Sequence, residues 1–307
     1  MARHSFGFPP TVSLVLASAF WAIATVISKE LLASVPPITL LVLQLVPSAL
    51  VLWILVAVHG TPPLCWREMP RLALLGVLNP GLSYTLSMLG LKTTTAGVAT
   101  LLWAAEPALI VVLAWLLLRE AITIRLAVFT ATAACGVVLV AGLLSSGDLA
   151  EGTAEGAILI LGGVFCCALY TVWCRAIAPA VDPLLTVSLQ QTTGLLWALA
   201  IWPLKLDGGG AGRLLSLTTP ELLGAVVAGL MYYAAAFWLY LNGLRAVPAS
   251  TAGMFINLTP VFGVATAYVF LGERLTQIQW FGAAIILTSV VALLTWSTSQ
   301  SGRQTRE

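Results

Sequence analysis

The sequence predicts an all-α membrane protein built from ten transmembrane helices in two related sets of five. Composition is the first observation behind this prediction: 60% of the 307 residues are hydrophobic and 8% are charged, whereas a soluble domain carries roughly 25% charged residues. One soluble core could not bury so much apolar surface, so lipid must be the solvent for most of it. The second observation is a motif that occurs twice, 153 positions apart, inside hydrophobic sequence.

Ten stretches are long and apolar enough to cross a bilayer, since a span needs about 20 mostly apolar residues. Most connections between them are only three or four residues long, which predicts that consecutive spans are antiparallel neighbours. The expected spans are 11–33, 37–59, 70–91, 95–118, 123–144, 156–178, 182–204, 221–244, 249–271 and 276–298.

The duplicated motif consists of a glycine, a proline and a glutamate at fixed spacing. Its two copies are Gly90, Pro107 and Glu120, and Gly243, Pro260 and Glu273. In both, 17 residues separate the glycine from the proline and 13 separate the proline from the glutamate. The starts of the halves also match, at an offset of 146, through the pairs Lys29 and Arg175, Pro37 and Pro183, and Gln44 and Gln190. A longer glycine-rich loop around 207–212 accounts for the difference in offset.

Each half holds five helices, and five is odd, so the halves must enter the membrane in opposite directions. This predicts an inverted repeat related by a pseudo-two-fold axis in the membrane plane. The expected division is a first five-helix repeat at 1–144, a linker at 145–155, a second repeat at 156–298 and a cytoplasmic tail at 299–307.

The distribution of Lys and Arg predicts the orientation, because cytoplasmic loops carry an excess of them. With the N-terminus inside, nine of these residues lie on the inner side and five on the outer side. Both termini are therefore expected in the cytoplasm. Ala17-Ser18-Ala19 resembles a signal-peptide cleavage site, but the apolar run continues to Ile27. The first span is therefore expected to remain in the protein as a transmembrane helix.

Several kinds of chemistry lack support in the sequence. There is no polybasic run for nucleic acid, no Gly-rich nucleotide loop and no metal-ligand spacing among five cysteines and two histidines. The cysteines are interpreted as small helix-packing residues. No Lys or Arg lies at the centre of a span, which argues against a phosphorylated substrate. The chain is thus expected to use no cofactor or metal, and to be a monomer with a small-molecule substrate.

Glu106 stands out among the 12 acidic residues because it lies at the middle of a predicted span. A charged carboxylate at the bilayer centre costs roughly 2.5–3.5 kcal/mol on insertion scales. The carboxyl group must therefore face a watery cavity, stay protonated or have a partner. The favoured interpretation is that it faces a cavity, and a proton-linked role is a second possibility.

Prolines mark the expected hinges. Pro107 and Pro260 each remove a backbone hydrogen bond and crowd the carbonyl group four residues earlier. Asn79-Pro80-Gly81 interrupts the third span. The expected hinge residues are Pro80, Gly81, Pro107 and Pro260; the alternative for the paired prolines is a static kink that helps packing.

Polar and aromatic side chains gather at matching depths of the two halves, as a small amphipathic solute would need. The expected cavity residues are Asn79, Tyr84, Trp103, Glu106, Tyr232, Asn257 and Thr259. Trp21, Tyr170 and Trp173 are weaker candidates, since a single aromatic residue is more often in contact with lipid or a neighbouring helix.

The chain resembles the drug/metabolite transporters of the EamA type over about residues 11–298, and among them it is most similar to bacterial inner-membrane amino-acid exporters. The motifs that carry the resemblance are the ten spans, the paired prolines and the endings Leu118-Arg119-Glu120 and Leu271-Gly272-Glu273. The resemblance implies a basket-like bundle with a central cavity and alternating access by rocking of the halves. A Glu before the repeat proline fits the family at Glu106, whereas Thr259 departs from it in the second half.

The preferred hypothesis is a secondary transporter that exports amino acids and related small amphipathic metabolites. The alternative within transport is proton-coupled efflux of cationic or multidrug compounds, with Glu106 shared by proton and substrate. An intramembrane enzyme would need a nucleophile or metal cluster at membrane depth, and the sequence offers neither. A sensor or scaffold would need an additional soluble domain or a long tail, and the sequence after Thr298 is short.

Overall fold

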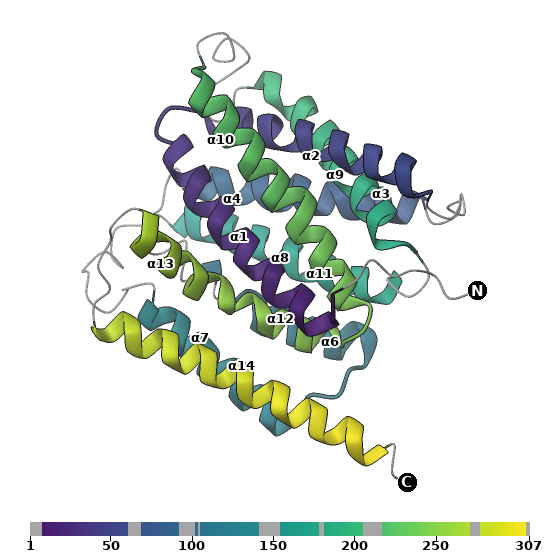
Figure 1. Cartoon of the computed structure of the whole chain (residues 1–307), viewed down its shortest axis with the longest axis vertical. Coiled ribbons are helices and arrows are strands. Elements are labelled where there is room, and N and C mark those ends of the chain that lie inside the picture. Colours follow the sequence, from purple (N-terminus) through teal and green to yellow (C-terminus); the bar gives the residue numbers. More distant parts are fainter. Residues whose placement is uncertain are drawn as a thin grey trace.

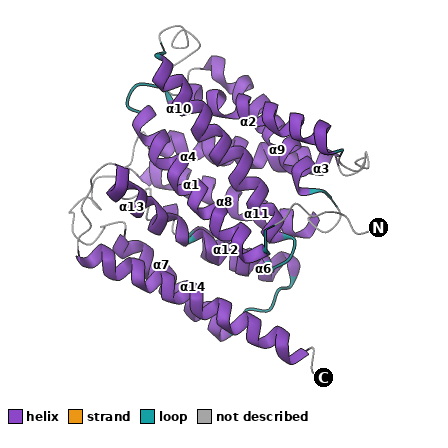
Figure 2. Ribbon diagram, in the orientation of Figure 1, coloured by secondary structure: helices purple, strands orange, loops and turns teal. Residues whose placement is uncertain are grey.

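The computed structural model describes residues 8–60, 69–91, 102–103, 105–140, 154–177, 181–204, 217–270 and 277–304. Every regular element in these ranges is a helix, as Figure 2 shows. Within these ranges the helices form ten segments when two that are interrupted only at Asn257 are counted as one, so the prediction of ten helices is confirmed. Residues 95–101, 104, 141–144, 178, 271 and 276, at the ends or inside predicted spans, lie outside the described residues.

The helices of the first half are α1 (Pro10–Leu31), α2 (Pro37–His59), α3 (Met69–Gly76), the π-helix η1 (Val77–Leu82), α4 (Ser83–Leu91), α6 (Glu106–Leu118) and α7 (Ile124–Val140). Those of the second half are α8 (Ala154–Ile177), α9 (Pro183–Ile201), the short 3₁₀ turn η3 (Trp202–Leu204), α10 (Thr219–Gly229), the π-helix η5 (Leu230–Ala236), α11 (Phe237–Leu244), α12 (Ala249–Ile256), α13 (Leu258–Phe270) and α14 (Gln277–Gln304). The last helix continues six residues beyond its predicted end at 298.

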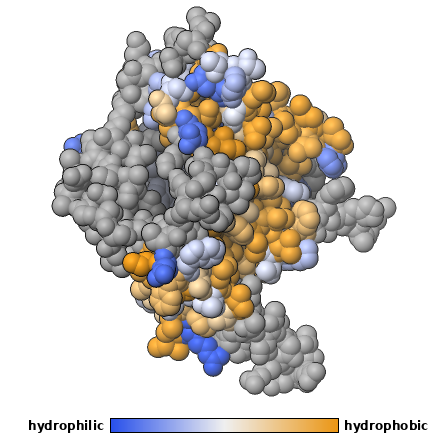
Figure 3. Space-filling view, turned by 60° about the vertical axis from the view of Figure 1, so that its left-hand side comes forward, coloured by the Kyte–Doolittle hydropathy of each residue, from blue (hydrophilic) through white to orange (hydrophobic). Residues whose placement is uncertain are grey.

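Five helical segments within the described ranges are long and apolar enough to cross a membrane by length and composition. The outer surface of the described helices is apolar as well, as expected where lipid replaces water around it. Large hydrophobic side chains such as Ile158, Trp280 and Phe281 are at least 60% exposed. Hydrophobic residues cover much of the coloured surface in Figure 3.

Helix starts follow ordinary capping chemistry. The carboxylate of Asp182 accepts hydrogen bonds from the backbone N–H groups of Leu184 and Leu185, and Pro183 occupies the first turn of α9. Thr218 and Glu221 form a capping box at the start of α10. These signals set where the helices of the second half begin.

The central helices of each half pack against the other half (Figure 1). Helix α1 packs against α10, η5, α11 and α13, while α8 packs against η1, α4 and α6. Helix α2 contacts α9 and α10, and α9 contacts α2 and α3. Helices α7 and α14 lie side by side at one edge of the bundle (Figure 1). The first turn of α1 and the last turn of α14 point toward the same side in Figure 1.

Two glycines allow the closest of these approaches. A Cβ atom on Gly76 would lie 2.3 Å from the carbonyl oxygen of Gln190, and one on Gly229 would lie 2.3 Å from that of Gln44. Such distances are shorter than van der Waals contact, so only glycine fits at either crossing.

Candidate substrate cavity

A cavity of about 530 Å³ lies among helices of both halves. Its volume is within the range of small-molecule sites, roughly 300–1,000 Å³. All seven expected cavity residues and one expected hinge residue, Pro107, lie in the lining: Asn79, Tyr84, Trp103, Glu106, Pro107, Tyr232, Asn257 and Thr259. No Lys, Arg or His is found among the described residues that line it. The lining is therefore mostly apolar and aromatic, with a few polar groups and one acidic group.

Of the other expected hinge residues, Pro80 and Gly81 are absent from the described lining. Pro80 lies between helices, where a Cβ atom on Gly194 of α9 would meet its ring at 2.5 Å. Gly81 is buried, and its Cα faces the indole ring of Trp197. Pro260 belongs to α13, but its side chain is outside the described part of the chain. Pro107 therefore lies at the cavity, whereas Pro80 and Gly81 pack against α9.

Helix interruptions occur at the predicted places. Asn79 has extended backbone angles (φ −149°, ψ 120°) inside η1, and the Asn79–Pro80 peptide bond is cis. Helix α6 begins at Glu106, so Pro107 lies in its first turn, where a missing N–H leaves no hydrogen bond unmade. Helix α12 ends at Ile256, and α13 starts after a turn at Asn257. The polar cavity residues thus sit where the helices are broken, as in many transporters.

Glu106 is buried, with 5% of its surface exposed. Its carboxyl group lies beside the thiol of Cys167 on α8. The side-chain amide of Asn79 donates to the same sulfur atom at 3.5 Å. Cys167 therefore connects the acidic residue of α6 with the broken helix η1.

Aromatic rings form the opposite wall. The ring centroid of Trp21 lies 5.2 Å from that of Tyr240, 5.4 Å from Phe237 and 6.4 Å from Tyr232. The hydroxyl groups of Tyr84 and Tyr232 are hydrogen-bonded to each other across the two halves. Rings at these separations give an extended apolar surface whose faces favour cations and whose edges favour the faces of other rings.

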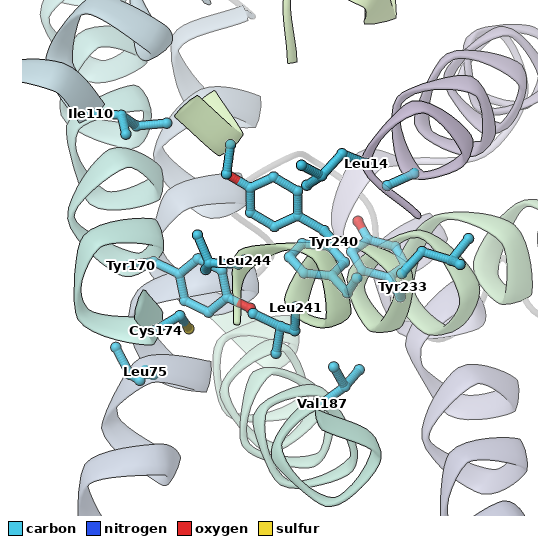
Figure 4. Close-up of a cluster of buried hydrophobic side chains, with 14 of the residues drawn as sticks. Leu14, Leu75, Ile110, Tyr170, Cys174, Val187, Tyr233, Tyr240, Leu241 and Leu244 are labelled. Atoms are coloured by element: carbon cyan, nitrogen blue, oxygen red, sulfur yellow. The ribbon is translucent and has the colours of Figure 1, made fainter. Parts of the chain in front are cut away.

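The cavity extends toward one end of the bundle and is closed at the other. On α1 and α2 its lining runs from Trp21 to Leu32 and from Pro37 to Gln44, toward the loop that joins these helices. The opposite end is filled by a buried cluster that includes Leu14, Tyr170, Tyr240 and Leu244 (Figure 4). Among the described residues, one end of the site is therefore closed by side-chain packing and the other is not.

Three hydrogen-bonded contacts reinforce the closed end. The guanidinium group of Arg175 donates to the carbonyl oxygens of Leu244 at 3.1 Å and Arg245 at 2.8 Å, at the end of α11. The hydroxyl group of Ser18 donates to the carbonyl oxygen of Phe255 at 2.8 Å. The third lies between Glu120 and the start of α12, and like the contact of Ser18 it joins the two halves.

Sequence reasoning missed Cys167, which was interpreted as a packing residue. Its neighbour Cys166 fits that interpretation, as it makes no polar contact that the structure records. The repeat could have identified Cys167 as a cavity candidate, because Cys167 occupies the position equivalent to Trp21 at the offset of 146. Of the weaker candidates, Trp21 and Tyr170 line the cavity, whereas Trp173 is exposed on the outer surface.

A polytopic helical bundle with a cavity between its halves is the architecture of a membrane transporter. The chain belongs to the EamA-like transporter family of the drug/metabolite transporter superfamily, whose sequence profile matches residues 10–142 and again 154–295.

Individual relatives agree with this membership. The chain is 24% identical to the uncharacterized transporter YvbV of Bacillus subtilis, covering 91% of this chain and 90% of that protein. It is 22% identical to protein PecM of Dickeya dadantii, covering 90% and 89% of the two chains. The WAT1-related chloroplastic protein At3g02690 of Arabidopsis thaliana is 25% identical, and the match covers 88% of this chain and 66% of that protein. A solved crystal structure has the same fold, with a TM-score of 0.77 at 17% identity, over 91% of this chain and 96% of the other.

Proposed function

We propose that this protein is a secondary transporter that exports amino acids and related small amphipathic metabolites carrying an amino group. The observation that carries the proposal is Glu106: one buried carboxyl group in an apolar cavity whose described lining holds no basic side chain. An ammonium group on the substrate would supply the missing partner. A buried charged pair of this kind is favourable only when both members are present and hydrogen-bonded.

The inverted repeat belongs to the same proposal, and equivalent contacts support it. Gly76 meets the backbone of Gln190, and Gly229 meets that of Gln44. The side-chain amide of Gln44 donates to Ser28 at 2.8 Å, and that of Gln190 donates to Cys174 at 3.4 Å. Each pair is related to the other by the offsets of the duplicated sequence. Packing in which each half makes the same contacts with the other is what a pseudo-two-fold axis requires.

Alternating access follows from this symmetry. The two repeats, 1–144 and 156–298 with a linker at 145–155, would exchange conformations, so that the closed end opens and the open end closes. The proposed location is the inner membrane of a bacterium. The distribution of Lys and Arg supports an orientation with both termini in the cytoplasm. In that orientation the cavity of this structure faces outward, because it extends toward the loop between α1 and α2.

Proton-coupled efflux of cationic compounds remains the second candidate, and one observation favours it. Aromatic rings beside a carboxyl group form a site for organic cations without any need for a carboxylate on the substrate. Glu106 would then bind proton and substrate in alternation. The two candidates differ in whether transport responds to a proton gradient.

Proteoliposomes loaded with a mixed amino-acid pool test both candidates. Counterflow of labelled amino acids is measured for the parent and for Glu106→Gln, with and without a proton gradient. We expect counterflow above that of empty liposomes, and its loss in Glu106→Gln. Amino-acid export is rejected if a folded parent protein moves no amino acid, and cationic compounds are then assayed in the same vesicles.

A variant that keeps exchange but no longer responds to the gradient would identify Glu106 as the coupling residue. Exchange without any gradient effect in the parent would instead identify a facilitator. Glu155→Gln, at the start of α8 and outside the cavity lining, is the matched control.

A further inference from the structure

Buried polar atoms without a hydrogen-bond partner are concentrated at the cavity. They include the indole nitrogen of Trp21, Oδ1 of Asn79, the hydroxyl group of Ser87 and that of Thr259. All four residues line the cavity. An unpartnered buried polar group costs about 1–3 kcal/mol, so such groups normally have a partner. At a cavity wall, the partner they lack is a ligand or water.

The duplicated sequence relates six residues of the cavity lining, among them Trp21, Asn79 and Thr259, as two equivalent sets of three. Asn79, Cys167 and Glu106 form one set; Tyr232, Trp21 and Thr259 occupy the equivalent positions in the other. We call the first the acidic half-site and the second the neutral half-site. All six residues line the same cavity, so it presents two unlike walls at symmetry-related places.

The acidic half-site accepts hydrogen bonds. Cys167 contacts both other members, since Asn79 donates to its sulfur atom and its thiol contacts the carboxyl group of Glu106. Asn79 is 1% exposed, and its Oδ1 atom has no partner. Two oxygen-bearing groups, an amide and a carboxyl, therefore face the cavity from adjacent helices. An ammonium group, which has only donors, is the complementary ligand.

The neutral half-site donates hydrogen bonds. The indole N–H of Trp21 can only donate, and the hydroxyl group of Thr259 can donate as well. Neither has a hydrogen-bond partner in the part of the chain that the structure describes. The ring of Tyr232 lies 6.4 Å from that of Trp21 and offers an apolar surface beside these donors. A ligand with a carbonyl or carboxylate oxygen next to an apolar group would accept hydrogen bonds from these donors and contact the ring of Tyr232.

The geometry points to a substrate that binds with fixed polarity: its amino group at the acidic half-site and its carbonyl or carboxylate oxygen at the neutral half-site. Trp21 and Thr259 are then the residues that distinguish amino acids from simple amines. Cys167 is a positioning residue that holds Glu106 and Asn79 together. This inference rests on the proposed transport of amino compounds and adds the orientation of the substrate and the residues that select its oxygen.

Three related probes separate the two half-sites: L-phenylalanine, phenylethylamine, which lacks the carboxylate, and 3-phenylpropionate, which lacks the amino group. Binding is measured by calorimetry on the full chain in detergent. In the double variant Trp21→Phe with Thr259→Val, which removes both donors and keeps an aromatic ring at position 21 and the branched shape at position 259, we expect affinity for phenylalanine to fall at least tenfold. Affinity for phenylethylamine should stay within twofold.

Glu106→Gln should produce the complementary result, with at least tenfold weaker binding of both amines and no loss for 3-phenylpropionate. Trp173→Phe, on the exposed face of α8, is the matched control and should change none of the three affinities. Cys167→Ser keeps a donor and an acceptor and should retain more phenylalanine binding than Cys167→Ala. Thermal unfolding of each variant verifies that it is folded.

Equal losses of phenylalanine and phenylethylamine in the folded double variant would overturn the fixed polarity while leaving the proposed transport intact. Absence of binding by all three probes to the folded parent would reject the proposed function and this inference together.

Discussion

The carboxylate of Glu120, at the end of α6, accepts hydrogen bonds from both the backbone N–H and the hydroxyl group of Ser250, at 3.2 and 2.7 Å. It also accepts one from the backbone N–H of Ala249 at 2.9 Å. The first turn of α12 therefore receives its cap from the other half of the chain. A negative charge is favourable there because helix N-termini carry free N–H groups and a positive partial charge. This contact gives a physical role to the glutamate that ends the duplicated motif.

Removal of this cap should weaken the protein. Glu120→Ala leaves two backbone N–H groups without their acceptor, and we expect it to lower the free energy of unfolding by about 1–2 kcal/mol. Denaturant unfolding in detergent micelles measures the change. Glu30→Gln, an exposed acidic residue near the end of α1, should have no such effect. An unaltered unfolding transition for Glu120→Ala would mean that the cap contributes nothing to stability.

The two close helix crossings should be equally intolerant of a methyl group. Gly76→Ala and Gly229→Ala each place a Cβ atom 2.3 Å from a backbone carbonyl oxygen, and backbone cannot move aside as a flexible side chain can. We expect each to lower the free energy of unfolding by about 1–3 kcal/mol. Gly162→Ala, whose nearest contact would be 3.5 Å, is the control. A large effect at one crossing and none at the other would count against equivalent packing of the two halves.

Two threonines at equivalent positions of the two halves should differ in their accessibility to an external reagent. Thr25 is exposed at the open end of the cavity, whereas Thr171, at the same position of the second half, is 2% exposed. In a variant without native cysteines, Thr25→Cys should react with a membrane-impermeant thiol reagent added outside, and Thr171→Cys should not. Mass spectrometry measures the labelled fraction. Reaction of Thr25→Cys only from the inside would reverse the proposed orientation.

The contact of Arg175 with the end of α11 should hold the closed end together. Its guanidinium group donates to two carbonyl oxygens at a helix C-terminus, where a positive charge is favourable. We expect Arg175→Ala to increase labelling of Thr171→Cys from the cytoplasmic side severalfold. Arg245→Ala removes an exposed side chain of the same type and serves as the control. If both variants leave labelling unchanged, Arg175 is not part of the closure.

Much of the helix pattern could be predicted because lipid imposes it. Apolar segments of about 20 residues separated by short polar connections have few other possible structures. The predicted second span, 37–59, coincides with α2, and the predicted breaks at Asn79 and before Pro107 are present. These features depend on local chemistry, namely hydropathy and the missing N–H of proline, which can be read along the chain.

The sequence by itself determined the ten helices, the duplication and the single acidic residue deep in a span. Only the tertiary structure decided that Cys167 contacts Glu106, that Trp21 faces Tyr232, and that one end of the cavity is closed. The reason is that membrane helices are apolar all round, so hydropathy does not indicate which face of a helix meets its neighbours. Contacts between distant residues depend on how the helices are rotated and how closely they approach, and these follow from packing at sites such as Gly76 and Gly229.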